Sequence, residues 1–113
     1  MKVKIYINKL GFKLEYERKE DKFAFISLEN NQIMLQEINN NWFTGPLEYP
    51  FGRGINFEMT VSNIDALYNK IKLENLTLFK DIKISKYRKD NETITQKEFL
   101  IQDSDGYLLR FTD

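Results

Sequence analysis

The chain has 113 residues, of which 42% are hydrophobic and 30% charged, values typical of one globular domain and not of a disordered chain. Its 17 basic and 17 acidic residues balance, so no charge surplus favours nucleic acid as a partner. The absence of cysteine and histidine excludes disulfides, thiolate metal sites and serine–histidine catalysis. No long apolar run or signal-type segment occurs, so we expect a cytoplasmic protein with no membrane partner.

The first half of the chain predicts a short helix followed by three strands. Val3–Leu10 carries a weak helical stripe that ends at Gly11, a residue type that often terminates helices. The same segment is rich in strand-forming residues, so a strand is the alternative. Alternating apolar and charged residues predict a half-buried strand with Phe12, Leu14 and Tyr16 on its inner face. Further strands are expected at Phe23–Leu28 and Gln32–Glu37.

The second half predicts a strand, a helix and then more strands. Ile55–Val61 alternates apolar residues with a polar face of Asn56, Glu58 and Thr60. Ser62 or Asn63 caps a helix whose buried stripe is Ile64, Leu67, Tyr68 and Ile71. Strands follow at Ile82–Arg88, Thr93–Gln102 and Tyr107–Phe111, the first of them approached through Leu76–Phe79. The basic run Lys80–Lys89 alternates with apolar residues, which favours a strand with one solvated face over a phosphate-binding site.

The two halves therefore repeat one pattern on either side of a linker, Trp42–Gly54, that is rich in glycine, proline and aromatic residues. Two similar halves joined by a loop usually form a pseudo-symmetric sheet with a ligand cleft between them. A long loop in a small domain is more often functional than idle. The repeat indicates where a ligand would bind, but not which ligand it is.

Four stretches, taken in their order and spacing, resemble a known superfamily. They are Leu10-Gly11-Phe12 with Glu15-Tyr16-Glu17-Arg18, then Phe51–Phe57, Val61–Tyr68 and Phe99–Phe111. Together they resemble the glyoxalase/bleomycin resistance protein/dioxygenase superfamily, which has the vicinal-oxygen-chelate fold. The turn Asp103-Ser104-Asp105-Gly106 and the helix that starts at Asn63 carry the pattern of its second half. The linker with the strand after it, Trp42–Phe57, resembles the bleomycin-resistance-protein-like branch.

The resemblance covers nearly the whole chain and implies an α+β fold of paired βαβββ modules. These would form a curved mixed sheet with a central cleft, usually in a homodimer. A single domain would then comprise module one at about residues 1–41, the linker at about 42–54 and module two at about 55–113. The opening strand of the family is either missing here or replaced by Met1–Ile7. A missing strand leaves a sheet edge that another subunit could cover.

Metal-dependent members of the superfamily place histidine or glutamate at four matching strand positions. Of these, the opening-strand position is absent here, and the others fall on Asn56, on Arg110 and near Gln36 or Glu37. A guanidinium is permanently protonated and cannot coordinate a cation. The resemblance therefore implies no catalytic metal and no cofactor, with Glu37 as the remaining candidate ligand.

The candidate ligand-binding residues come from the linker and from the polar strand face. In a cleft, Trp42, Tyr49 and Phe51 could stack on a flat heteroaromatic ring, or they could instead cover the core edge or a dimer interface. The family resemblance implies that Asn56, Glu58 and Arg110 line the cleft.

Two of these candidates have a structural alternative. Glu58 and Arg110 either pair with each other or recognise charged groups of a ligand. Arg53, between two glycines, either binds an anion or is a solvated hinge residue. Asp103 and Asp105 are expected to shape a turn and not to bind calcium.

The sequence thus predicts a metal-independent protein that binds a small molecule and is not an enzyme. The resemblance implies that the ligand is a bleomycin-type antibiotic. Bleomycins are cationic, however, and a chain with balanced charge attracts cations less than an acidic one. The alternatives are a divalent-metal-dependent lyase or dioxygenase, and a scaffold dimer whose cleft its own side chains close.

Overall fold

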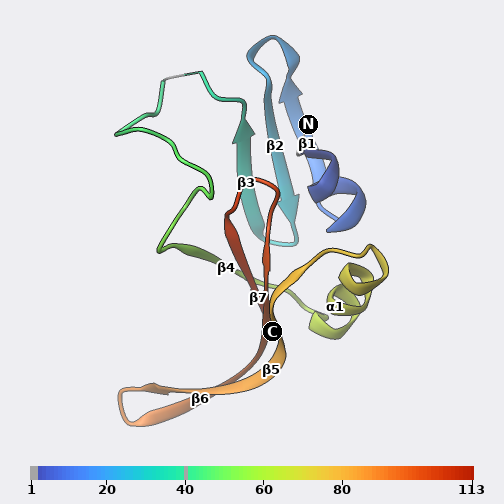
Figure 1. Cartoon of the computed structure of the whole chain (residues 1–113). Helices are drawn as coiled ribbons and strands as arrows, with labels where there is room; N and C mark the ends of the chain where they lie inside the picture. The colour runs from blue at the N-terminus through green and yellow to red at the C-terminus, as the bar shows by residue number, and fades with distance from the viewer. Residues whose placement is uncertain (1–2, 40) are drawn as a thin grey trace. The chain divides into compact units, whose positions relative to one another are not determined.

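A computed structural model describes residues 3–39 and 41–113 and divides the chain into two compact units, Met1–Tyr49 and Pro50–Asp113 (Figure 1). The first unit contains the π-type helix η1 (Ile5–Lys9), the 3-10 helix η2 (Lys19–Asp21) and strands β1 (Lys13–Arg18), β2 (Phe23–Leu28) and β3 (Asn31–Gln36). The second contains strand β4 (Asn56–Thr60), helix α1 (Ile64–Leu73) and strands β5 (Leu78–Lys89), β6 (Glu92–Gln102) and β7 (Leu108–Thr112). This mixture confirms the expected α+β class, with the strands organised as one sheet in each unit.

The first segment is helical, as the stripe in Val3–Leu10 predicted. The N–H of Leu10 donates to the carbonyl of Ile5 at 3.1 Å, and Gly11 then ends the helix with a φ of +86°. Tyr6 is buried and packs edge-on against Phe12, with ring centroids 5.3 Å apart. Within the described residues no strand precedes β1, and Met1 and Lys2 lie outside them.

Strand β1 departs from the half-buried strand that alternation predicted, because Leu14 and Tyr16 are 37% and 51% exposed. A bulge between them shifts the register, so that Leu14 lies opposite Ile26 and Tyr16 lies opposite Phe25. Ile26 and Phe25 are adjacent and point to opposite faces, so Leu14 and Tyr16 do so too. The extra residue of the bulge therefore breaks the inner face that the sequence pattern indicated.

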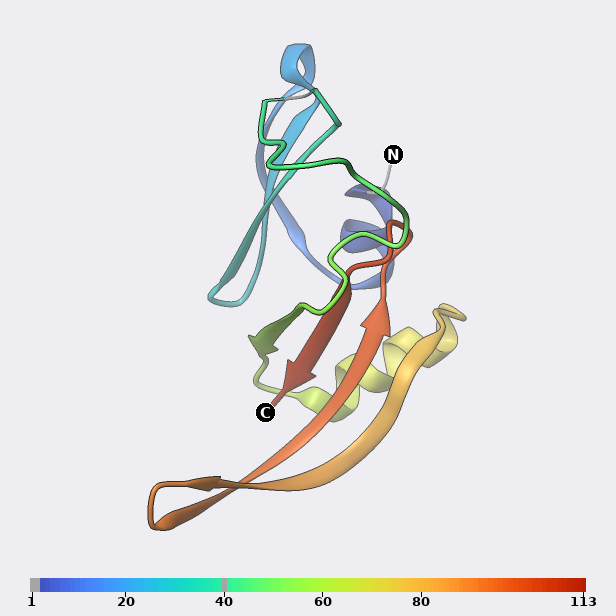
Figure 2. The ribbon, with the colours of Figure 1, turned by 60° about the vertical axis from the view of Figure 1, so that its left-hand side comes forward.

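The second unit has a mixed sheet in the order β4-β7-β6-β5, in which β4 and β7 are parallel and the other pairs are antiparallel. Helix α1 covers one of its faces, where the ring centroids of Tyr68 and Phe99 lie 5.5 Å apart. Figure 2 shows the long hairpin of β5 and β6 curving away from the rest of this sheet. The core of the unit lies between the helix and the sheet; its buried side chains include Ile64, Leu67, Ile71, Phe99, Leu109 and Phe111.

The helix begins where the sequence indicated. The Asn63 side-chain oxygen accepts a hydrogen bond from the N–H of Ala66 at 3.0 Å, so Asn63 and not Ser62 is the N-cap. No helix in the described part of the chain is long and apolar enough to cross a membrane.

Strand β5 is longer than predicted, because Leu76–Phe79 and Ile82–Arg88 are not separate segments. Its pairing with β6 shifts around Lys80 and continues past Lys83. In this irregular stretch the Asp81 carboxylate accepts hydrogen bonds from the Tyr68 hydroxyl at 2.6 Å and from the N–H of Ile82 at 2.7 Å. The polar pair Lys80-Asp81 that interrupts the sequence pattern is thus accommodated inside one strand.

The turn before β7 has the structural role expected of it. One Asp103 carboxylate oxygen accepts from the N–H groups of Asp105 and Tyr107, each at 2.9 Å. Gly106 has a φ of +101°, and a Cβ there would lie 2.5 Å from the Cβ of Pro50. The turn therefore packs directly against the start of the chain segment that leads into β4.

Candidate functional site

The candidate site lies on the face of the second sheet opposite helix α1. Strand register places Glu58 on β4 beside Arg110 on β7, and Glu98 lies one step diagonally from Arg110 on β6. We call this surface the polar face; it consists of Asn56, Glu58, Tyr87, Glu98 and Arg110. The sheet thereby gathers side chains that are far apart in the sequence.

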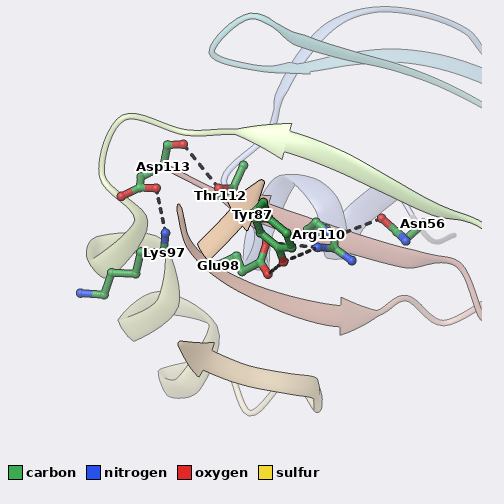
Figure 3. A network of polar contacts seen from close by, with 7 residues as sticks. All are labelled: Asn56, Tyr87, Lys97, Glu98, Arg110, Thr112 and Asp113. Atoms are coloured by element: carbon green, nitrogen blue, oxygen red, sulfur yellow. Dashed lines mark hydrogen bonds and ion pairs between the residues drawn. The ribbon is translucent and has the colours of Figure 1, made fainter. Parts of the chain in front are cut away.

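Arg110 is the centre of a hydrogen-bonded network on this face (Figure 3). Its Nη1 donates to Oε2 of Glu98 at 3.1 Å and to the Tyr87 hydroxyl oxygen at 3.3 Å, while its Nε donates to Oδ1 of Asn56 at 3.2 Å. The Tyr87 hydroxyl in turn donates to the other Glu98 oxygen, Oε1. The network fixes the plane of the guanidinium from two sides.

Glu98 is 2% exposed and is nevertheless charged. Burial raises the pKa of its carboxyl, but hydrogen bonds from Tyr87 and Ser85 and the Arg110 charge outweigh burial, and the net pKa falls below the ordinary value. For Arg110, burial lowers the pKa, whereas Tyr87 and Glu98 raise it, and the net pKa is raised. The face therefore holds an internal ion pair at neutral pH.

Three of the residues proposed from the sequence, Asn56, Glu58 and Arg110, come together here. The alternative that Glu58 pairs with Arg110 is wrong, because the carboxylate that pairs with Arg110 belongs to Glu98. Glu58 is exposed and is its lateral neighbour only. Glu98 accepts from Nη1 of Arg110 and also from the Tyr87 hydroxyl.

The remaining candidates lie elsewhere in their units. The ring centroids of Phe51 and Tyr107 are 6.1 Å apart, and Nε of Arg53 donates to the carbonyl of Pro50 at 3.2 Å. Both residues therefore shape the loop that leads into β4. Trp42, which is 81% exposed, and Tyr49 belong to the irregular end of the first unit.

Glu37, the remaining candidate metal ligand, forms an ion pair with Lys22 at 3.6 Å. Among the described residues, no group of three or more acidic side chains lies close enough together to hold a metal ion. At two positions where the sequence resemblance implies metal ligands, this chain has the Asn56 amide and the Arg110 guanidinium, which are hydrogen-bonded to each other.

Sequence reasoning missed Glu98 and Tyr87. Glu98 directly precedes the buried run Phe99-Leu100-Ile101, and a charge at the start of such a run is a signal that a partner must be near. The signal could not name Arg110 as that partner, because the pairing depends on the register of β6 and β7.

No family model matches the chain, and no curated protein matches it either. Solved structures do match. A glyoxalase/bleomycin resistance protein/dioxygenase from Alicyclobacillus acidocaldarius is 20% identical, covers 96% of this chain and 77% of its own, and superposes with a TM-score of 0.66. A superfamily member from Sphaerobacter thermophilus is 17% identical, with coverages of 96% and 82% and a TM-score of 0.60. One from Vibrio splendidus is 31% identical, with coverages of 97% and 84% and a TM-score of 0.49.

Proposed function

We propose that this chain, which has the fold of the glyoxalase/bleomycin resistance protein/dioxygenase superfamily, binds a small organic molecule non-covalently and without a catalytic metal. The observation that carries the proposal is the state of Arg110. Its guanidinium stands at a strand position where the sequence resemblance implies a metal ligand, and a buried carboxylate, Glu98, already balances its charge. A chain that has this fold but a guanidinium in place of the implied metal ligand is suited to binding a small molecule without a metal.

The side chains at these positions do not fit a divalent cation. The Arg110 guanidinium has no lone pair to donate, and its fixed charge repels a metal ion. Both Glu98 oxygens already accept hydrogen bonds, from Tyr87 and from Arg110. Asn56 directs its carbonyl oxygen at Arg110, so its acceptor is also occupied. This donor set argues against a metal-dependent lyase or dioxygenase.

On the polar face of the second unit, the ligand-facing groups would instead be the exposed side chains of Asn56 and Glu58. In the first unit, Trp42 has an exposed indole that is suited to stacking. A bleomycin-type antibiotic is the specific ligand that we propose to test first, on the resemblance of the linker to that branch. Because the chain has no acidic surplus, any binding should depend on shape and stacking and little on long-range charge attraction.

The experiment is a fluorescence titration of EDTA-treated protein, with Trp42 as the intrinsic reporter. Metal-free bleomycin is compared with a cationic peptide of similar charge, and a library of flat heteroaromatic compounds is screened in parallel by ligand-observed NMR. Saturable binding of a library compound or of bleomycin, without added metal, supports the proposal. An equal response to bleomycin and the peptide removes the antibiotic. Binding that requires Mg²⁺ or Mn²⁺, or no binding at all, contradicts the proposed function.

We further propose that the protein is a cytoplasmic homodimer. The last strand of the second unit, β7, pairs with β6 on one side and with β4 on the other. The last strand of the first unit, β3, pairs with β2 on one side, and within the described residues no strand pairs with its other edge. An edge of this kind is commonly covered by a second subunit. Light scattering after size exclusion measures the mass: a dimer supports this proposal, and a monomer at high concentration contradicts it.

A further inference from the structure

Building on the proposed small-molecule binding, we propose that the polar face recognises a neutral carboxamide group on its ligand. The recognising atoms are Nη2 of Arg110, Nδ2 of Asn56 and the carboxylate of Glu58. Arg110 would therefore bind a neutral group here and not an anion.

The two donors are oriented by bonds within the network. Nε of Arg110 can only donate, so the Asn56 atom that faces it must be the carbonyl oxygen, and the amide nitrogen Nδ2 points away (Figure 3). Nη1 of Arg110 is occupied by Glu98 and Tyr87. Within the described part of the chain, neither Nη2 of Arg110 nor Nδ2 of Asn56 contacts an acceptor.

The acceptor is Glu58, which lies directly beside Arg110 on the neighbouring parallel strand. Neighbouring strands are about 5 Å apart, and side chains in register share a face. Glu58 is exposed, and no described residue donates a hydrogen bond to its carboxylate. The donors of Arg110 and Asn56 and the acceptor Glu58 therefore lie on neighbouring strands of one sheet face.

Charge selects against an anion at this position. Glu98 already neutralises Arg110 through a buried contact of 3.1 Å, so the guanidinium offers hydrogen bonds without a net positive field. An incoming carboxylate would lie beside Glu58 and would be repelled by it.

A carboxamide satisfies both kinds of group at once. Its carbonyl oxygen accepts from Nη2 of Arg110 and Nδ2 of Asn56, and its amino group donates to Glu58. A carboxylate has no donor for Glu58, and an amidinium has no acceptor for the two nitrogens. Arg110 is half-buried, so leaving its Nη2 without an acceptor disfavours the amidinium, while repulsion by Glu58 disfavours the carboxylate.

The test uses three probes of equal shape and different charge: benzamide, benzoate and benzamidinium. Binding is followed by NMR shifts of the Asn56 side-chain amide and the Arg110 guanidinium in the full chain. Benzamide should shift both signals saturably and bind at least about tenfold more tightly than either analogue. Benzoate binding as tightly as benzamide, or benzamide leaving both signals unmoved, overturns the inference.

Two variants separate recognition from folding. Asn56→Asp keeps an oxygen that accepts from Arg110 and replaces the Nδ2 donor by a second, negatively charged acceptor, so it should fold and lose benzamide binding. Glu58→Gln should narrow the preference for benzamide over benzoate. The matched control Glu92→Gln makes the same charge change on the same face near the hairpin tip and should leave the preference intact.

The outcomes also distinguish this inference from the proposed function. If a compound from the heteroaromatic screen binds metal-free protein but benzamide shows no preference, only the carboxamide inference fails. If neither the screen nor the probes bind, both fail. Benzamide binding that survives in Asn56→Asp places recognition elsewhere and also overturns the inference.

Discussion

Arg110 forms its ion pair with Glu98 on β6, at 3.1 Å, although Glu58 is its direct neighbour on β4. The different surroundings of the two carboxylates explain why Arg110 pairs with Glu98. Glu98 is buried and also accepts from the Tyr87 hydroxyl, whereas Glu58 is exposed to water, which competes for its charge. Glu98 thus stabilises the sheet, whereas Glu58 can interact with a ligand.

Replacing Arg110 should destabilise the protein strongly. Arg110→Met leaves the Glu98 carboxylate buried without its countercharge, and breaking such a pair costs about 3 kcal/mol. Urea unfolding measures the loss. Lys13→Met, which removes an exposed ion pair with Glu15 at 3.6 Å, serves as the control and should change stability by no more than about 0.5 kcal/mol. Equal effects of the two variants would contradict the importance of the buried pair.

The stability should depend on acidity through Glu98. Its folded-state pKa is lower than the ordinary value of 4.5, so the folded state binds the proton more weakly than the unfolded chain does. The stabilisation is therefore fully present above pH 4.5 and is lost as the pH falls through the folded-state pKa. Unfolding measured from neutral to acid pH should show a smaller acid-induced loss in Glu98→Gln. Identical pH profiles for the variant and the wild type would refute this role of Glu98.

A side chain at residue 106 should disturb the turn before β7. Gly106→Ala places a Cβ 2.6 Å from the Cα of Pro50 and 2.8 Å from the backbone nitrogen of Phe51, at a φ of +101°. We expect a loss of about 1–3 kcal/mol in thermal or urea unfolding. Gly45→Ala is the matched control, because a Cβ there has no atom within 4 Å. A loss at residue 45 as large as that at residue 106 would argue against a specific clash.

The contact between Tyr68 on helix α1 and Asp81 on β5 should be detectable in the pKa of Asp81. The Tyr68 hydroxyl and the N–H of Ile82 hold the pKa of Asp81 below its ordinary value of 3.8. Tyr68→Phe removes the larger of these contributions, so the pKa of Asp81 should move back upward. Carbon-detected NMR of the carboxyl group follows it directly. Tyr16→Phe, in the first unit, should leave the pKa of Asp81 where it is in the wild type, and a pKa of Asp81 that does not move in Tyr68→Phe would exclude the hydroxyl as its cause.

Local patterns were enough to predict most elements of this chain. The cap of α1, predicted as Ser62 or Asn63, is Asn63, and most of the predicted buried stripe of α1 is buried. The turn at Asp103 was predicted correctly. These features depend on neighbours a few residues away. For the first segment the sequence pattern favoured a helix and left a strand as the alternative, and the structure has a helix that Gly11 ends. The polar face of β4 follows from alternation alone, which is why Asn56 and Glu58 could be proposed before any tertiary contact was known.

The sequence, through its resemblance to a known superfamily, indicated the α+β class, and its alternation indicated the polar strand that carries part of the candidate site. Tertiary structure alone decided the bulge that separates Leu14 from Tyr16, the continuity of β5 and the pairing of Arg110 with Glu98. The physical reason is that register between strands depends on hydrogen bonds between distant segments. A shift by one residue changes every cross-strand partner without changing the pattern along either strand.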